Sequence, residues 1–222
     1  MKTKVIMVRH GETEWNVLCK FLGSVDLPLN EKGRRQAGYA QDALKDEHIE
    51  VIYSSPMKRA CETAEIIRGD RTLEIHTDAG LREISCGKWE GLDGREVEER
   101  YPGQIALWGS RPEELRIEGG DTFLEVSERI VDAFFRIVDA NRGKTILMTS
   151  HMICLTLLLI HFEGKRINEM WNVKPIGNAA LNIVEVEEDN EIRITAWSDD
   201  GFVPEEDRKG SVLVAGRNYI EE

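Results

Sequence analysis

Val5-Ile6-Met7-Val8 is a short apolar run that leads directly into Arg9-His10-Gly11-Glu12-Thr13-Glu14-Trp15-Asn16. Four consecutive apolar residues are typical of a strand that is buried on both faces. The histidine, with an arginine before it and a glycine after it, then stands where the strand leaves the sheet. In open α/β sheets, ligands bind outside the carboxyl ends of the strands. The stretch therefore predicts a central strand with a binding site at its end.

Further apolar runs alternate with helical patterns, which indicates an α/β fold. Expected strands beyond the first lie at Val51-Tyr53, Leu73-Ile75 and Thr145-Met148, with a late hairpin formed by Ala180-Val186 and Ile192-Trp197. No repeat or Pro/Ser-rich linker divides the 222 residues. We expect one domain over residues 1–222, with a mixed, mostly parallel sheet and helices on both faces.

Helix starts are marked by residues that cap helices. Asn30 is expected to cap one helix, and Ser55 followed by Pro56 is a typical cap and first helical position. Thr122 and Glu125 fit a capping box, and Ser150 is expected to cap a helix from His151 to about Phe162.

Composition limits the partners and the compartment. The formal net charge of −12 argues against a nucleic-acid or anionic-membrane surface, since both usually require a broad basic face. The longest apolar run, Ile153 to Ile160, is far too short for a membrane span. The chain start does not resemble a signal peptide, and four scattered cysteines are expected to be buried, reduced thiols. These features favour a cytoplasmic protein.

Three strand-to-helix junctions carry charged or ionisable residues. They are Val8-Arg9-His10, Tyr53-Ser54 leading to Arg59, and Thr149-Ser150-His151. Parallel strands end at the same edge of a sheet, so the three junctions are expected to converge. Helix N-termini favour anions, and the added arginine and histidine indicate a phosphate site.

Four blocks together carry a resemblance to a known family: Arg9-His10-Gly11-Glu12-Thr13, Ser54-Ser55-Pro56-Met57-Lys58-Arg59-Ala60, Leu81-Arg82-Glu83-Ile84 and Ser150-His151. In this order the chain resembles the histidine phosphatase superfamily, also called the phosphoglycerate mutase-like family. The resemblance implies the phosphoglycerate mutase-like fold and an enzyme that transfers phosphoryl groups through a phosphohistidine, without a metal or another cofactor.

The resemblance also implies roles for single residues. His10 would be the nucleophile, and Arg9, Arg59 and His151 would surround the phosphoryl oxygens. Glu83 would be the general acid that protonates the leaving alkoxide and then the base that activates water. Asn16 and the backbone near Leu22 and Gly23 would add neutral hydrogen bonds. Met152 stands where the family usually has glycine, so its side chain would affect the size of the pocket.

Departures from the mutase pattern favour hydrolysis. Mutases need extra cations to hold a bisphosphate, but Ile84, Gly94 and Gly109-Ser110 occupy cationic positions of that pattern. We therefore expect a phosphomonoesterase acting on a small phosphorylated metabolite. The alternative is a cofactor-dependent phosphoglycerate mutase. Arg111 and Arg116 could supply the missing positive charge to the pocket if the chain there is shifted in register relative to the mutase pattern. A non-catalytic module that binds phosphorylated ligands is a further alternative.

The sequence also gives expectations for the region around the pocket and for the remaining aromatic and histidine residues. Residues 100–120, rich in glycine, proline and charge, are expected to form a cap over the pocket. Trp15, Trp89 and Trp108 suit either a pocket wall or the core. His48, His76 and His161 match no block and are expected on the surface or in packing. The sequence does not fix the oligomeric state, and a homodimer is compatible with it.

Overall fold

A computed structural model describes residues 2–208 and places them in six strands and eight α-helices, besides short 3-10 turns. The strands are β1 (Thr3–Arg9), β2 (Val51–Ser54), β3 (Ile75–Thr77), β4 (Thr145–Ser150), β5 (Leu181–Val186) and β6 (Ile192–Asp199). They form one sheet in the order β3-β2-β4-β1-β5-β6. β4 is parallel to β1 and to β2, whereas β5 is antiparallel to β1 and to β6. The mixed, mostly parallel sheet is confirmed.

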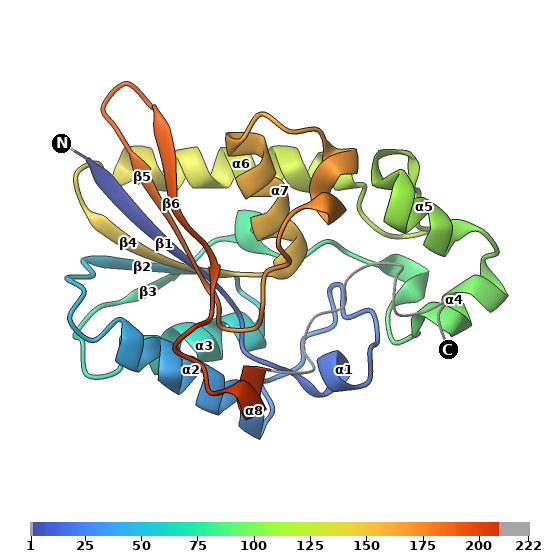
Figure 1. Ribbon diagram of the computed structural model, residues 1–222, viewed down its shortest axis with the longest axis horizontal. Helices are drawn as coiled ribbons and strands as arrows, with labels where there is room; N and C mark the ends of the chain where they lie inside the picture. The colour runs from blue at the N-terminus through green and yellow to red at the C-terminus, as the bar shows by residue number, and fades with distance from the viewer. Residues whose placement is uncertain (1, 209–222) are drawn as a thin grey trace.

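Helices cover both faces of this sheet (Figure 1). On one face lie α6 (Phe123–Ala140) and α7 (Met152–Phe162); on the other lie α2 (Glu31–Ala43), α3 (Lys58–Arg68) and α8 (Glu205–Arg208). The short helices α1 (Glu14–Val17), α4 (Gly94–Arg100) and α5 (Gln104–Ser110) lie beyond one end of the strands. Side chains of β1 alternate between two apolar clusters. Val5 and Met7 pack on the α6 side, and Ile6 and Val8 pack on the α2 side.

Several details of the sequence prediction change. The third strand lies at Ile75–Thr77 rather than Leu73-Ile75, because its register with β2 pairs Ile75 with Ile52 and Thr77 with Ser54. Asn30 and Thr122 cap their helices as expected. Ser55 and Ser150 do not: α3 begins after Met57, and β4 runs through Ser150 so that His151 occupies the cap position of α7. Cys86 and Cys154 are buried as expected, whereas Cys19 is exposed and Cys61 is half-buried.

Candidate active site

The three predicted junctions meet at the carboxyl ends of adjacent parallel strands. His10 follows β1, and its amide donates to Ser150 O of β4 at 3.0 Å. The amide of Ser55, after β2, donates to Thr149 O at 2.9 Å. The rings of His10 and His151 lie 5.1 Å apart between centroids. The extension of the β-ladder past the strands therefore places two histidines from distant parts of the sequence side by side.

His10 is held in one orientation. Its Nδ1 lies 2.7 Å from Gly11 O, so this nitrogen is assigned as the N–H that donates to the carbonyl. The ring nitrogen Nε2 then carries the lone pair. Burial lowers the pKa of His10 well below 6.5, and the positive charges of Arg59 and Arg9 lower it further. A neutral imidazole with a lone pair on Nε2 is the form that can attack phosphorus.

Gly11 permits this arrangement because the chain passes very close to α2. A Cβ on Gly11 would lie 2.3 Å from Gly33 O, which is backbone and cannot move aside cheaply. The Gly11 amide donates to Thr63 Oγ1 of α3 at 3.1 Å. The turn after His10 is thus fixed against α2 and α3.

Two buried arginines flank His10. Arg9 Nη1 donates to Ile176 O at 2.6 Å. Arg59 Nη1 and Nη2 donate to Val25 O at 2.8 Å and Gly23 O at 3.0 Å, while its Nε has no partner among the described residues. Burial lowers the pKa of Arg9 to about 10, which leaves the guanidinium charged at neutral pH. The pair supplies positive charge and fixed donors for an oxyanion.

His151 is fully buried and is oriented by Ser55. Its Nε2 lies 2.8 Å from Ser55 Oγ, and its Nδ1 has no partner within the described part of the chain. Burial lowers the pKa of His151 well below 6.5, and Arg59 and His10 add to the effect. Ser55 is a site residue that sequence reasoning missed. Its place before a proline was interpreted as a helix cap, and only the pairing of β2 with β4 brings its hydroxyl to the imidazole.

Glu83 reaches the same cavity from the irregular segment between β3 and α4. Its Oε1 accepts from Ile84 N at 3.1 Å, and its Oε2 accepts from Ile153 N in the first turn of α7 at 3.4 Å. The carboxyl is half-buried and lines the cavity together with His10 and Arg59. The position suits a group that exchanges protons at the cavity.

The remaining predicted ligands come from the chain after β1. Asn16 is buried and uses its side-chain oxygen to accept from Thr13 N and Thr13 Oγ1, both at 3.0 Å. Its amide NH₂ is therefore the end that can donate to a ligand. Gly23 has φ +53°, and its carbonyl is taken by Arg59. Glu90, which sequence reasoning also missed, accepts from Ser24 N at 2.7 Å and Cys86 N at 3.2 Å, and so fastens this loop to the Glu83 segment.

Most of these groups line one pocket. One part, the phosphoryl half, consists of Arg9, His10 and Arg59, which line the pocket, and of His151, which lies behind this lining with its ring beside that of His10. The other, the leaving-group half, has apolar walls, formed by Phe21, Leu22, Ile84, Trp108, Met152 and Ile153. Met152 lies at the first position of α7, a helical conformation that tolerates a side chain, and its side chain occupies the wall. Lys20, which donates to Gly91 O at 2.7 Å, is the added cation among the described lining residues.

Trp108 belongs both to the wall and to the core. From α5, inside the predicted cap, its ring packs on Phe21, Phe123 and Trp171 at centroid distances of 5.3, 5.0 and 5.7 Å. Trp89 is core, and Trp15 contacts the region of Gly91. His48, His76 and His161 are all exposed.

Arg111 and Arg116, the extra cations of the mutase alternative, have their contacts outside the pocket lining. Arg111 pairs with Glu114 at 2.9 Å, and Arg116 donates to Glu113 O and Leu115 O. Neither of these described residues lines the cavity, whereas the uncharged Ile84 does. In the described structure neither arginine is placed to supply charge to the site.

Within residues 2–208, no three His, Cys, Asp or Glu side chains gather in a way that could hold a metal ion. In the same range no helix is long and apolar enough to cross a membrane.

Comparison with known proteins places this site in a family. The sequence profile of the histidine phosphatase superfamily (branch 1) matches residues 5–200. Phosphoserine phosphatase 1 of Hydrogenobacter thermophilus is 31% identical over 83% of this chain and 87% of its own. A metal-independent phosphoserine phosphatase of Arabidopsis thaliana is 30% identical over 89% of this chain and 82% of its own. The solved structure of Bacillus stearothermophilus YhfR superposes with a TM-score of 0.86 at 33% identity, covering 89% of this chain and 97% of that one.

The chain belongs to the histidine phosphatase superfamily. With phosphatases among its relatives, it is a phosphatase-type hydrolase of that family.

Proposed function

We propose that this phosphatase hydrolyses monoesters of small phosphorylated metabolites in two displacements through a phosphohistidine at His10. One observation carries the proposal: a buried imidazole has Nδ1 2.7 Å from Gly11 O and lies between two buried arginines in the pocket lining, where burial and both positive charges lower its pKa. The arrangement leaves Nε2 as the single nucleophilic atom of that ring.

In the first displacement, Nε2 of His10 attacks phosphorus and the bond from phosphorus to the leaving oxygen breaks. Glu83, as the carboxylic acid, gives its proton to that oxygen, and the alcohol leaves. Arg9, Arg59 and His151 hold the equatorial oxygens while charge develops on them. Charge-assisted hydrogen bonds from fixed guanidinium groups need little reorganisation during this step.

In the second displacement, the Glu83 carboxylate takes a proton from water as the water oxygen attacks phosphorus. The bond between phosphorus and Nε2 breaks, inorganic phosphate forms, and the imidazole returns to its neutral form. Glu83 is again protonated, so the cycle closes without another proton donor.

The leaving-group half supports hydrolysis over a mutase reaction. Retention of a bisphosphate requires cations around its second phosphate, and Lys20 is the cation that the described walls provide beyond Arg9 and Arg59. A charge-assisted hydrogen bond contributes roughly 1.5 to 3 kcal/mol. With Ile84 in the wall, water is favoured over a returning phosphoglycerate as the acceptor.

The same walls favour leaving groups with an apolar or aromatic body. Phe21, Ile84, Trp108 and Met152 present apolar surface, and Lys20 offers one charged contact. Aryl and bulky alkyl phosphates should therefore have higher kcat/KM than phosphoserine or 3-phosphoglycerate. The reverse order in a screen of phosphate release would contradict this assignment.

The test of the intermediate is rapid quenching with a phosphate ester labelled at phosphorus. We expect label on the protein that is lost in acid and retained in alkali, as a phosphoramidate requires, and no label or turnover in His10→Ala. The exposed His48→Ala is the matched control and should label like the wild type. Normal labelling of His10→Ala would overturn the nucleophile, and an absence of phosphate release from any ester would favour a non-catalytic binding module.

A further inference from the structure

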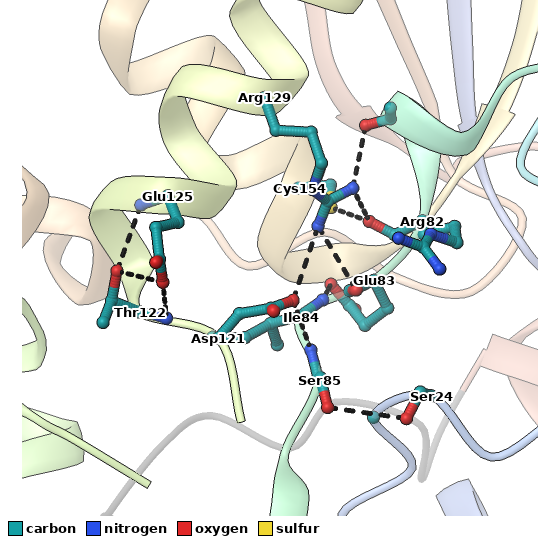
Figure 2. Close-up of polar contacts among 12 residues, drawn as sticks. Ser24, Arg82, Glu83, Ile84, Ser85, Asp121, Thr122, Glu125, Arg129 and Cys154 are labelled. Carbon is teal, nitrogen blue, oxygen red and sulfur yellow. Dashed lines mark hydrogen bonds and ion pairs between the residues drawn. The ribbon is translucent and has the colours of Figure 1, made fainter. Parts of the chain in front are cut away.

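Arg129 of α6 binds the backbone of the segment that carries Glu83. Its Nη1 donates to Gly80 O at 2.9 Å and Arg82 O at 2.7 Å, and its Nη2 donates to Glu83 O at 3.4 Å. Figure 2 shows the guanidinium between this segment and Asp121. Nη1 of Arg129 also donates to Ala79 O at 3.4 Å. One charged side chain thus holds four carbonyls over five residues, which matches the several fixed donors of a guanidinium.

A second set of contacts holds the segment from its other end. Arg129 Nη2 pairs with Asp121 Oδ2 at 3.9 Å, and the same oxygen accepts from Ser85 N at 2.9 Å (Figure 2). The thiol of the fully buried Cys154 donates to Arg82 O at 2.7 Å. The residues on either side of Glu83 are therefore fixed by side chains of α6 and α7 and of the loop before α6.

The segment needs such contacts because it has no strand partner. Residues 82–86 lie between the 3-10 turns Ala79–Leu81 and Gly87–Trp89, outside the sheet, so no β-ladder takes up their carbonyls. The carboxyl of Glu83 is bound by its neighbour Ile84 N and by a long contact to Ile153 N. Its position in the cavity consequently follows the position of its own main chain.

We propose that Arg129 is a positioning residue for the general acid: it fixes the main chain at Glu83 so that the carboxyl meets the leaving oxygen. Arg129 is not among the residues that line the cavity, so it acts through Glu83 rather than on substrate. This inference rests on the proposed role of Glu83. A misplacement of about 1 Å is enough to weaken a positioned catalytic group strongly.

Leaving-group dependence separates positioning from mere stabilisation of the fold. Arg129→Met should lower kcat/KM for an alkyl phosphate by about tenfold or more, because the alkoxide needs the proton. For p-nitrophenyl phosphate, whose leaving group needs little protonation, the loss should stay below about threefold. Arg129→Lys, which keeps the charge and can bind part of the carbonyl set, should restore part of the alkyl-ester activity.

Arg136→Met is the matched control. Arg136 lies two turns further along α6 and pairs with Asp78 at 2.6 Å, at the start of the same segment, but contacts none of residues 82–85 in the described structure. The Arg136→Met variant should leave the ratio of kcat/KM for alkyl phosphates to kcat/KM for aryl phosphates unchanged. Thermal unfolding of both variants, measured alongside, corrects the rates for the folded fraction.

A double-variant cycle with Glu83→Gln completes the test. If Arg129 acts through Glu83, adding Arg129→Met to Glu83→Gln should cost no further alkyl-ester activity. If Glu83→Gln loses activity mainly on alkyl phosphates but Arg129→Met loses it equally on alkyl and aryl phosphates, the positioning role of Arg129 is overturned. The proposed acid role of Glu83 then stands. If both variants lose activity equally on alkyl and aryl phosphates, the acid role of Glu83 is overturned, and the positioning role of Arg129 with it.

Discussion

The two halves of the cavity are built by different means. The phosphoryl half lies at the ends of β1, β2 and β4, where backbone hydrogen bonds such as His10 N to Ser150 O continue the sheet. The leaving-group half comes from irregular segments and short helices, held by side chains such as Arg129 and Glu90 and by the rings around Trp108. The sheet thus fixes Arg9, His10 and His151, whereas Arg59 comes from α3 and is held by the carbonyls of Gly23 and Val25. Side-chain contacts fix the groups proposed to meet the alcohol. The halves should therefore respond differently to substitution.

The largest expected effect lies in the phosphoryl half. Arg59→Met removes a buried cation beside His10 and should lower kcat/KM by about a thousandfold or more for every ester, since one fixed donor to a developing oxyanion alone accounts for 10²- to 10³-fold. The loss should be similar for aryl and alkyl phosphates. Steady-state rates with both ester types check it.

Arg34→Met serves as the control on the neighbouring helix α2, where Arg34 forms a surface pair with Glu62. It should keep nearly full activity. A loss below about tenfold in Arg59→Met would place the main stabilisation of the phosphoryl group elsewhere.

The pH dependence of stability should also come from the phosphoryl half. His10 and His151 have lowered pKa values in the fold, so below about pH 6.5 the unfolded chain binds protons that the folded chain does not. The free energy of unfolding should therefore fall as pH drops below 6.5, by about 1.4 kcal/mol per pH unit for each histidine. Urea unfolding between pH 5 and 7 in buffer without phosphate measures this slope.

His10→Asn and His151→Asn should each flatten that slope, whereas His48→Gln, at an exposed position, should not. Equal slopes in all four proteins would contradict the burial of neutral imidazoles.

The smallest expected effect belongs to the leaving-group half. Trp108→Leu removes aromatic wall and should raise KM for naphthyl phosphate by about tenfold, given the 1–3 kcal/mol of such a contact. Inhibition by inorganic phosphate should stay unchanged, because the phosphoryl half does not include Trp108. Trp197→Leu on β6 provides a control outside the cavity. Weaker phosphate inhibition in Trp108→Leu would show that the two halves are not independent.

Sequence reasoning found the phosphoryl half because its residues obey a local rule. Arg9, His10 and His151 follow apolar strand patterns, and parallel strands end at one edge, so their convergence was predictable. Ser55 was misinterpreted because a serine before proline is a typical cap, and its pairing with His151 depends on a contact between residues 96 positions apart.

The contacts that hold the leaving-group half could not be predicted from the sequence, because they too join residues far apart in the chain. Arg129 and Glu90 reach backbone groups 46 to 66 residues away, and no periodicity marks such contacts. The sequence allowed Trp108 either a place in the pocket wall or a place in the core, and in the structure it has both. Side-chain contacts to irregular backbone leave no local pattern, in contrast to strands and capped helices.

The central claim is that the phosphoryl group passes through His10 before it reaches water. The stereochemistry at phosphorus tests this directly, with a thiophosphate ester made chiral by oxygen isotopes and hydrolysed in isotopically labelled water. Two successive in-line displacements predict retention of configuration. Inversion would mean a single displacement by water and would contradict the phosphohistidine.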